Sequence, residues 1–177
     1  MAKKFVGAFL TAVILGGVIF LVWSLATNNM VLGYNQGYEP DQPLPFSHET
    51  HAGKFQIDCK YCHVGVTSTR HALVPSLNIC MNCHIAVKLD SEHVQKIQAS
   101  YAASTPIEWK KVHLLPDHVK FNHAPHIQAG KDCTVCHGEV EKMPVVKQVQ
   151  SLSMGWCVNC HREKENNAAV TCGTCHY

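Results

Sequence analysis

Cys59-Lys-Tyr-Cys62-His63 is the first of five copies of one pattern, in which two cysteines are spaced by two residues and a histidine follows directly. The other copies are Cys80-Met-Asn-Cys83-His84, Cys133-Thr-Val-Cys136-His137, Cys157-Val-Asn-Cys160-His161 and Cys172-Gly-Thr-Cys175-His176. This spacing is typical of c-type haem attachment, because two thiols bond one edge of the porphyrin and the next imidazole coordinates the iron. The sequence therefore predicts five covalent haem c groups, each with a proximal histidine.

Other uses of paired cysteines fit the pattern less well. Zinc sites built from four thiolates would leave the five following histidines unexplained, and ten cysteines do not divide into groups of four. A redox-active dithiol motif does not normally occur five times in one chain. All ten cysteines are used by the five motifs, so haem attachment is the favoured interpretation.

Composition favours a small domain wrapped around its cofactors. The chain has 177 residues and a formal net charge of only +2, which does not suggest a nucleic-acid partner. Five haems would occupy much of the interior that side chains otherwise fill. We therefore expect mostly loops and short helices around five haems, with no strands of any length and little core without the haem.

An uncharged apolar segment lies near the N-terminus, from Phe5 to Ala26. As a helix it is long enough to cross a hydrocarbon layer of about 30 Å at about 1.5 Å per residue. Lys3 and Lys4 precede it, so the positive-inside rule predicts a cytoplasmic N-terminus and an external haem domain. We expect a retained transmembrane anchor over residues 1–30. A cleavable signal peptide is the alternative, but the apolar run exceeds the usual length of its hydrophobic region.

The rest of the chain contains an internal repeat. Residues 31–45 are rich in proline and glycine and read as a linker to a pentahaem domain over 46–177. Phe46-Ser-His48-Glu-Thr-His51 precedes the first motif, and Phe121-Asn-His123-Ala-Pro-His126 precedes the third. This predicts two dihaem modules, about 46–87 and 121–164, with a fifth haem over 165–177. Between the modules, Ser91 is positioned to start a short helix that ends before Pro106.

The sixth iron ligand decides the role of each haem, since a second strong ligand makes an electron carrier and an open position allows catalysis. The two Phe-x-His-x-x-His repeats make His48, His51, His123 and His126 the best distal candidates. For the remaining haem, His113 is the first choice and Met143 the second. His71, His93 and His118 rank lower. With enough ligands to close all five sites, the sequence predicts electron transfer and no catalytic residue.

The two modules resemble those of small multihaem cytochromes of the class III, c7-like type. In those proteins the first histidine of such a pair ligates the haem just downstream, and the second reaches a different haem. By that resemblance His48 would serve the first haem and His123 the third. His51 and His126 would each serve another haem, which the resemblance leaves open.

The longest resemblance is to the pentahaem subunit of bacterial alternative complex III. It is carried by Phe46-Ser-His48-Glu-Thr-His51, by Asp58-Cys-Lys-Tyr-Cys-His63 and by Ile79-Cys-Met-Asn-Cys-His84, and it continues through 106–113, 119–123 and 154–157. The resemblance implies a periplasmic electron-transfer subunit, single-pass in the bacterial inner membrane and not an enzyme on its own. Its partners would be polytopic quinol-oxidising membrane subunits, an iron–sulfur, molybdopterin-like subunit, and a monohaem cytochrome c or terminal oxidase.

Two other functions remain as alternatives. One is a membrane-anchored quinol dehydrogenase of the nitrate or nitrite reductase type, which also has one anchor and several haems. In that family the first haem motif is followed by x-Met, whereas Val64 and Gly65 follow His63 here. The other is an anchored cytochrome that shuttles electrons without a fixed complex.

Overall fold

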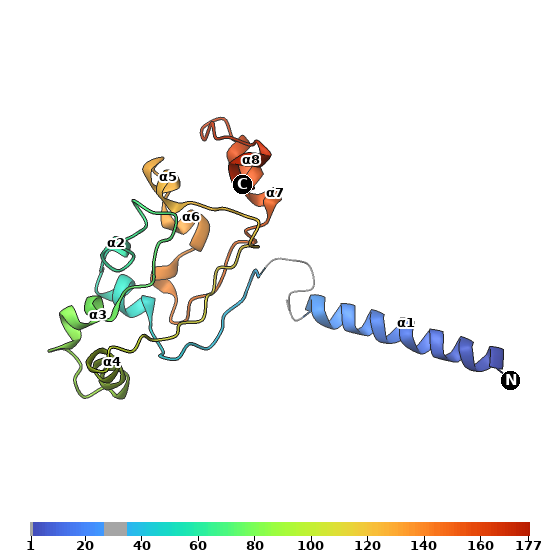
Figure 1. Ribbon diagram of the computed structural model, residues 1–177, viewed down its shortest axis with the longest axis horizontal. Coiled ribbons are helices and arrows are strands. Elements are labelled where there is room, and N and C mark those ends of the chain that lie inside the picture. Colours follow the sequence, from blue (N-terminus) through green and yellow to red (C-terminus); the bar gives the residue numbers. More distant parts are fainter. Residues whose placement is uncertain (1, 27–34) are drawn as a thin grey trace.

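The structure is a computed structural model that describes residues 2–26 and 35–177. Its elements in chain order are α1 (Ala2–Ala26), η1 (Glu49–Lys54), α2 (Cys59–Cys62), α3 (Leu77–His84), α4 (Glu92–Ala102), α5 (His123–Gln128), α6 (Cys133–His137), η2 (Val140–Lys142), α7 (Met154–Arg162) and α8 (Cys172–Cys175). Long loops join them, and the described ranges contain no strand (Figure 1). The prediction of short helices and loops is confirmed.

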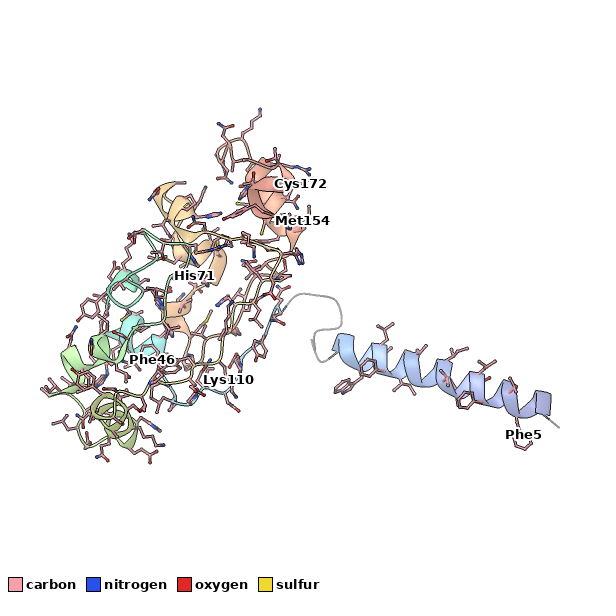
Figure 2. All side chains as sticks on the ribbon, viewed as in Figure 1. Phe5, Phe46, His71, Lys110, Met154 and Cys172 are labelled. Carbon is pink, nitrogen blue, oxygen red and sulfur yellow. The ribbon has the colours of Figure 1, made fainter. Side chains whose placement is uncertain are left out.

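Helix α1 extends away from the rest of the described chain (Figure 1). Its segment Phe5–Trp23 has a mean hydropathy of 2.6 and is long and apolar enough to cross a membrane. Phe5 and Phe9 are among its exposed side chains, and Figure 2 shows Phe5 pointing outward near the start of the helix. The helix is therefore a candidate membrane anchor. Residues 1 and 27–30 of the predicted anchor, and 31–34 of the predicted linker, lie outside the described residues.

The described part of the predicted linker, residues 35–45, begins with a turn, closed by Tyr38 N and the Asn35 carbonyl at 3.0 Å, and lies along the domain. Gly37 N donates to the carbonyl of Gln148 at 2.7 Å, and Gln148 N donates to the carbonyl of Tyr38 at 3.0 Å. The Gln42 side chain accepts from Lys110 N and donates to the Lys110 carbonyl, both at 2.9 Å. Leu44 is buried at the end of this segment. These bonds tie the segment to two distant parts of the chain.

Two pairs of short helices pack on each other. The short helix η1 packs on η2, and Glu49 N donates to the Met143 carbonyl at 3.0 Å. Helix α4 packs on α3, where the Gln98 side chain donates to the His84 carbonyl at 2.8 Å. The helix predicted after Ser91 is thus present as α4. Ser91 occupies its N-cap position without a capping side-chain hydrogen bond.

Few apolar side chains are buried in the part of the chain that the structure describes. They are Leu44, Val66, Val94, Ala124 and Met143. They are spread along the chain, from the segment before η1 to the end of η2, and do not form one helix or sheet face. The protein therefore owes little of its organisation to a core of apolar side chains.

Candidate functional site

Each Cys-x-x-Cys-His motif lies on a short helix. Helices α2, α6 and α8 begin at the first cysteine of their motif, and α3 and α7 contain theirs in their last turns. Asp58 caps α2 by accepting from Lys60 N at 2.7 Å, and Asp132 caps α6 by accepting from Thr134 N at 2.8 Å. Because residues three apart on a helix are neighbours, each turn presents both thiols on one side. That is the arrangement that covalent attachment to one porphyrin edge requires.

A second histidine ring lies close to the proximal histidine of every motif. The pairs and the distances between their ring centroids are His48–His63 at 6.5 Å, His51–His84 at 6.2 Å, His123–His137 at 6.4 Å, His126–His161 at 5.9 Å and His118–His176 at 5.6 Å. The planes of the first pair differ by 1° and those of the third by 7°. The first pair of each repeat thus has the same geometry, whereas the planes of His51–His84 and His126–His161 differ by 65° and 45°.

These distances fit two imidazoles that share one metal ion. A ligating imidazole nitrogen lies about 2 Å from a transition metal and about 1 Å from its own ring centre, so two such ligands on opposite sides have centroids about 6 Å apart. All five pairs lie near this value. The residues present therefore fit haem groups that are attached through cysteine and held by two axial histidines.

Hydrogen bonds to carbonyl groups fix the tautomer of most of these rings. Among the proximal histidines, four Nδ1 atoms contact carbonyl oxygens: His63 with Leu73 at 2.6 Å, His84 with Val87 at 3.1 Å, His161 with Ala169 at 2.8 Å and His176 with His118 at 2.9 Å. A carbonyl can only accept, so Nδ1 carries the proton in each. The Nε2 lone pair is then free to bind iron, as in other histidine-ligated metal sites.

The carbonyl that orients His63 belongs to a residue with an uncommon backbone conformation. Leu73 has a φ of 66°, in the left-handed region that bulky residues rarely adopt. Such strain persists where the surrounding structure requires it, often at functional sites. Here the conformation brings the Leu73 carbonyl to the ring of a proximal histidine ten residues earlier in the chain.

The histidine rings of the two Phe-x-His-x-x-His repeats contact the phenylalanine of their own repeat. Phe46 contacts the rings of His48 and His51, with centroids 4.9 and 4.3 Å apart. Phe121 contacts His123 and His126 in the same way, at 4.8 and 4.6 Å. The Nδ1 atoms of His51, His123 and His126 also contact carbonyl oxygens of Ser47, Arg70 and Asn122, at 2.8, 2.8 and 2.7 Å. One aromatic side chain per repeat therefore positions two imidazoles.

Burial keeps several of these imidazoles neutral, which is the form that binds a metal. Burial, with help from nearby His63 and His51, lowers the pKa of His48 to about 4. Burial, followed by the neighbouring His113, His123 and His63, lowers the pKa of His137 to about 4. The pKa of His126 is also lowered, chiefly by burial. At neutral pH these rings therefore carry lone pairs available for coordination.

The structure pairs the fifth motif with a histidine that the sequence ranked low. His118 lies beside His176, and the backbone joins the same two segments through Lys120 N and the Cys175 carbonyl at 2.8 Å. His113 instead contacts His137, and Met143 is buried at the end of η2. No local pattern marks His118, because its partner lies 58 residues further along the chain.

The two remaining histidines lie outside these pairs. His71 is exposed, and Figure 2 shows it in a loop of the domain. Its carbonyl accepts from the Thr69 hydroxyl at 2.6 Å. His93, on α4, lies 3.6 Å from the carboxylate of Glu92. Neither arrangement brings the ring to a proximal histidine.

Helical Cys-x-x-Cys-His turns with a paired histidine define a multihaem c-type cytochrome. In agreement, residues 119–177 match the family described as cytochrome c7 and related cytochrome c. This segment is a c7-like multihaem cytochrome domain, and the cofactor that it binds is covalently attached haem c. The prediction of a c7-like fold is confirmed for this part of the chain.

The similarity extends to a subunit of a menaquinone reductase. Over 164 residues the chain is 29% identical to the multihaem cytochrome c subunit of menaquinone reductase from Nitratidesulfovibrio vulgaris strain Hildenborough, and the match covers 78% of each chain. The present protein is thus a multihaem cytochrome c homologous to a menaquinone reductase subunit. This homology is consistent with electron transfer linked to a quinol.

Proposed function

We propose that this protein is a membrane-anchored pentahaem cytochrome c that relays electrons inside a quinol oxidoreductase complex. The observation that supports this most is the set of five histidine pairs, one for each attachment motif. Haem c with two strong axial ligands exchanges single electrons and leaves no coordination position for a substrate. The proposed distal ligands are His48, His51, His123, His126 and His118, for the first, second, third, fourth and fifth motifs respectively.

Contacts between motifs suggest the order in which the attachment sites follow one another in space. The Cys62 thiol lies near Cys80, and the Asn82 side chain donates to the Tyr61 hydroxyl at 3.0 Å, so the first and second sites adjoin. The Cys133 thiol lies within hydrogen-bonding reach of Cys59, which joins the third site to the first.

The remaining sites continue in the same direction. The Cys136 thiol lies near Cys160 and Cys157 of the fourth motif. Cys157 in turn lies near Cys175 of the fifth. The order is therefore second, first, third, fourth, fifth, and helices α3, α2, α6, α7 and α8 follow it across the domain in Figure 1. Figure 2 shows Phe46 and Cys172 far apart, near the two ends of this series.

The partners that we propose follow from the two resemblances. The relative is, by its name, a subunit of menaquinone reductase, and the motifs of this chain resemble the pentahaem subunit of alternative complex III. We propose polytopic quinol-oxidising membrane subunits, an iron–sulfur, molybdopterin-like subunit, and a monohaem cytochrome c or terminal oxidase as neighbours. The haem domain would lie in the periplasm, on the outer face of the inner membrane.

Purification in a mild detergent tests whether the protein works in a complex. We expect the chain to elute with several other subunits, including one polytopic membrane protein, in an assembly that oxidises a quinol. The mass and subunit content of the assembly are the measurements. A lone chain that oxidises quinol would favour the quinol dehydrogenase alternative, and a lone chain without that activity would favour an anchored shuttle.

Removal of the N-terminal helix tests the anchor separately. A variant in which residues 2–26 are replaced by a cleavable signal peptide is expected to mature with the same haem content and to leave the membrane fraction. The reason is that α1 contains the one described segment apolar enough to span a bilayer. Fractionation, followed by haem staining, measures the outcome. Full retention in membranes after washing with high salt would show that partner subunits, and not α1, hold the domain there.

A further inference from the structure

The third attachment site differs from the others in what contacts its proximal histidine. Four proximal histidines have their Nδ1 atoms on backbone carbonyls. At the third site the Nδ1 of His137 lies 3.1 Å from the Nε2 of another side chain, His113. A side chain can be replaced without changing the backbone, so the contact between His113 and His137 can be removed by a substitution at His113.

The distance between the two rings excludes a shared iron. The centroids of His113 and His137 are 4.4 Å apart and their planes differ by 82°. Two imidazoles on opposite sides of one metal require about 6 Å between centroids. The partner of His137 at that distance is His123, at 6.4 Å with nearly parallel planes. His113 thus contacts the far nitrogen of His137, on the side away from its pairing with His123.

The direction of this hydrogen bond follows from the proposed ligation. If the Nε2 of His137 binds iron, its Nδ1 carries the proton and must donate. The Nε2 of His113 then accepts, and the proton of the neutral His113 ring is on Nδ1. An imidazole that is neither protonated nor bound to a metal has one ring nitrogen that can accept a hydrogen bond. A neutral imidazole is a good acceptor for this bond.

The surrounding chain holds His113 in place. Lys110, three residues earlier, is bound by the Gln42 side chain through both its N–H and its carbonyl, each at 2.9 Å. Trp109 packs edge-on against Phe46, with centroids 6.5 Å apart. On the other side of the contact, Gly138 follows His137 with a φ of 72°, and a Cβ there would meet the Val149 side chain. Both partners of the bond are therefore fixed by tertiary contacts.

We propose that His113 is a positioning residue for the third haem site, which accepts the Nδ1–H of His137 and lowers the reduction potential of that site. A hydrogen-bond acceptor behind a ligating imidazole raises its basicity and favours the oxidised metal. The inference rests on the proposed ligation of the third site by His137 and His123. By the order of sites above, the third site lies in the middle of the series, with two sites on each side.

The test compares His113→Leu with His113→Gln in the full-length, haem-loaded protein purified in detergent. Potentiometric titrations followed by optical and EPR spectroscopy give the potentials and the spin states. In His113→Leu we expect one potential to rise, with about a tenfold change in the equilibrium constant for one-electron reduction, or about 59 mV. All five sites should stay low-spin. His113→Gln offers a carbonyl acceptor and should restore most of the shift.

Each other outcome has a defined meaning. The exposed His71→Leu is the matched control and should leave all potentials unchanged. A new high-spin signal in His113→Leu would make His113 an iron ligand and overturn the proposal. Unchanged potentials, or an equal shift of all five, would also overturn it, since the bond would then tune nothing or the change would be global. If His113→Leu does not accumulate, His113→Gln and His113→Asn still test whether the reach of the acceptor matters. We then expect the reduction potential of the third site to be unchanged in His113→Gln and shifted in His113→Asn. Equal shifts of this potential in both variants would count against the proposal. These readouts do not depend on quinol oxidation, so they separate this inference from the proposed function.

Discussion

Replacement of His118 by alanine is expected to convert one of the five proposed haem sites from low-spin to high-spin. The ring of His118 is the one paired with the proximal His176 of the fifth motif, with centroids 5.6 Å apart. Alanine removes the imidazole and leaves the iron with one strong axial ligand, a state whose EPR and optical spectra differ clearly from those of a six-coordinate haem. Because the backbone carbonyl of His118 also orients His176, and alanine keeps that carbonyl, the proximal ligand should stay in place.

Two matched variants decide between the candidates for this position. His113→Ala and Met143→Leu each remove a side chain that the sequence favours as the remaining distal ligand. We expect both to keep five low-spin sites, because His113 contacts His137 and Met143 is buried at the η1–η2 contact. If Met143→Leu gave the high-spin signal and His118→Ala did not, methionine would be the ligand and its site should have the higher potential.

Expression without haem attachment is expected to give a chain that does not fold cooperatively. The described residues bury only five apolar side chains, and the helices after α1 have 3 to 11 residues. Isolated helices of that length are marginal in water. Small domains of this kind depend on a bound metal or cofactor for their stability.

Residues 35–177 can be expressed in cells that lack the haem-attachment machinery. Calorimetry and circular dichroism of this haem-free polypeptide then measure whether it unfolds cooperatively. A folded domain of that size would unfold with an enthalpy of about 100 kcal/mol. We expect no such transition, and low helicity throughout the temperature range. The same chain with haem attached is the control and should melt in a cooperative transition. A cooperative melt of the haem-free chain would contradict the expectation.

Much of the candidate site could be predicted from local sequence. The five Cys-x-x-Cys-His motifs are complete within five residues each, so one helical turn decides where the thiols and the imidazole point. The Phe-x-His-x-x-His repeats are equally local. The structure shows their phenylalanine in contact with both histidines, as at Phe46 and Phe121. The repeat therefore carries its own positioning residue.

The proximal histidines beside which His51, His126 and His118 lie could not be predicted from local sequence. His51 lies beside His84 and His126 beside His161, which the repeat left open. His118 lies beside His176 because the last motif folds back onto the segment before α5. His113, the residue favoured by its place before the second module, instead lies behind the proximal histidine of the third motif.

The sequence by itself predicted the chemistry of this protein: haem attachment at the Cys-x-x-Cys-His motifs, a proximal histidine in each motif, a fold without strands, and an apolar segment long enough for a membrane. These properties depend on residues at most a few positions apart, or on composition alone. Only the tertiary structure decided which histidines pair, which sites adjoin and which imidazole lies behind His137. The contacts of His113 with His137 and of His118 with His176 join residues separated by 24 and 58 positions, and loops of that length have no preferred closure until the folded chain brings their ends together.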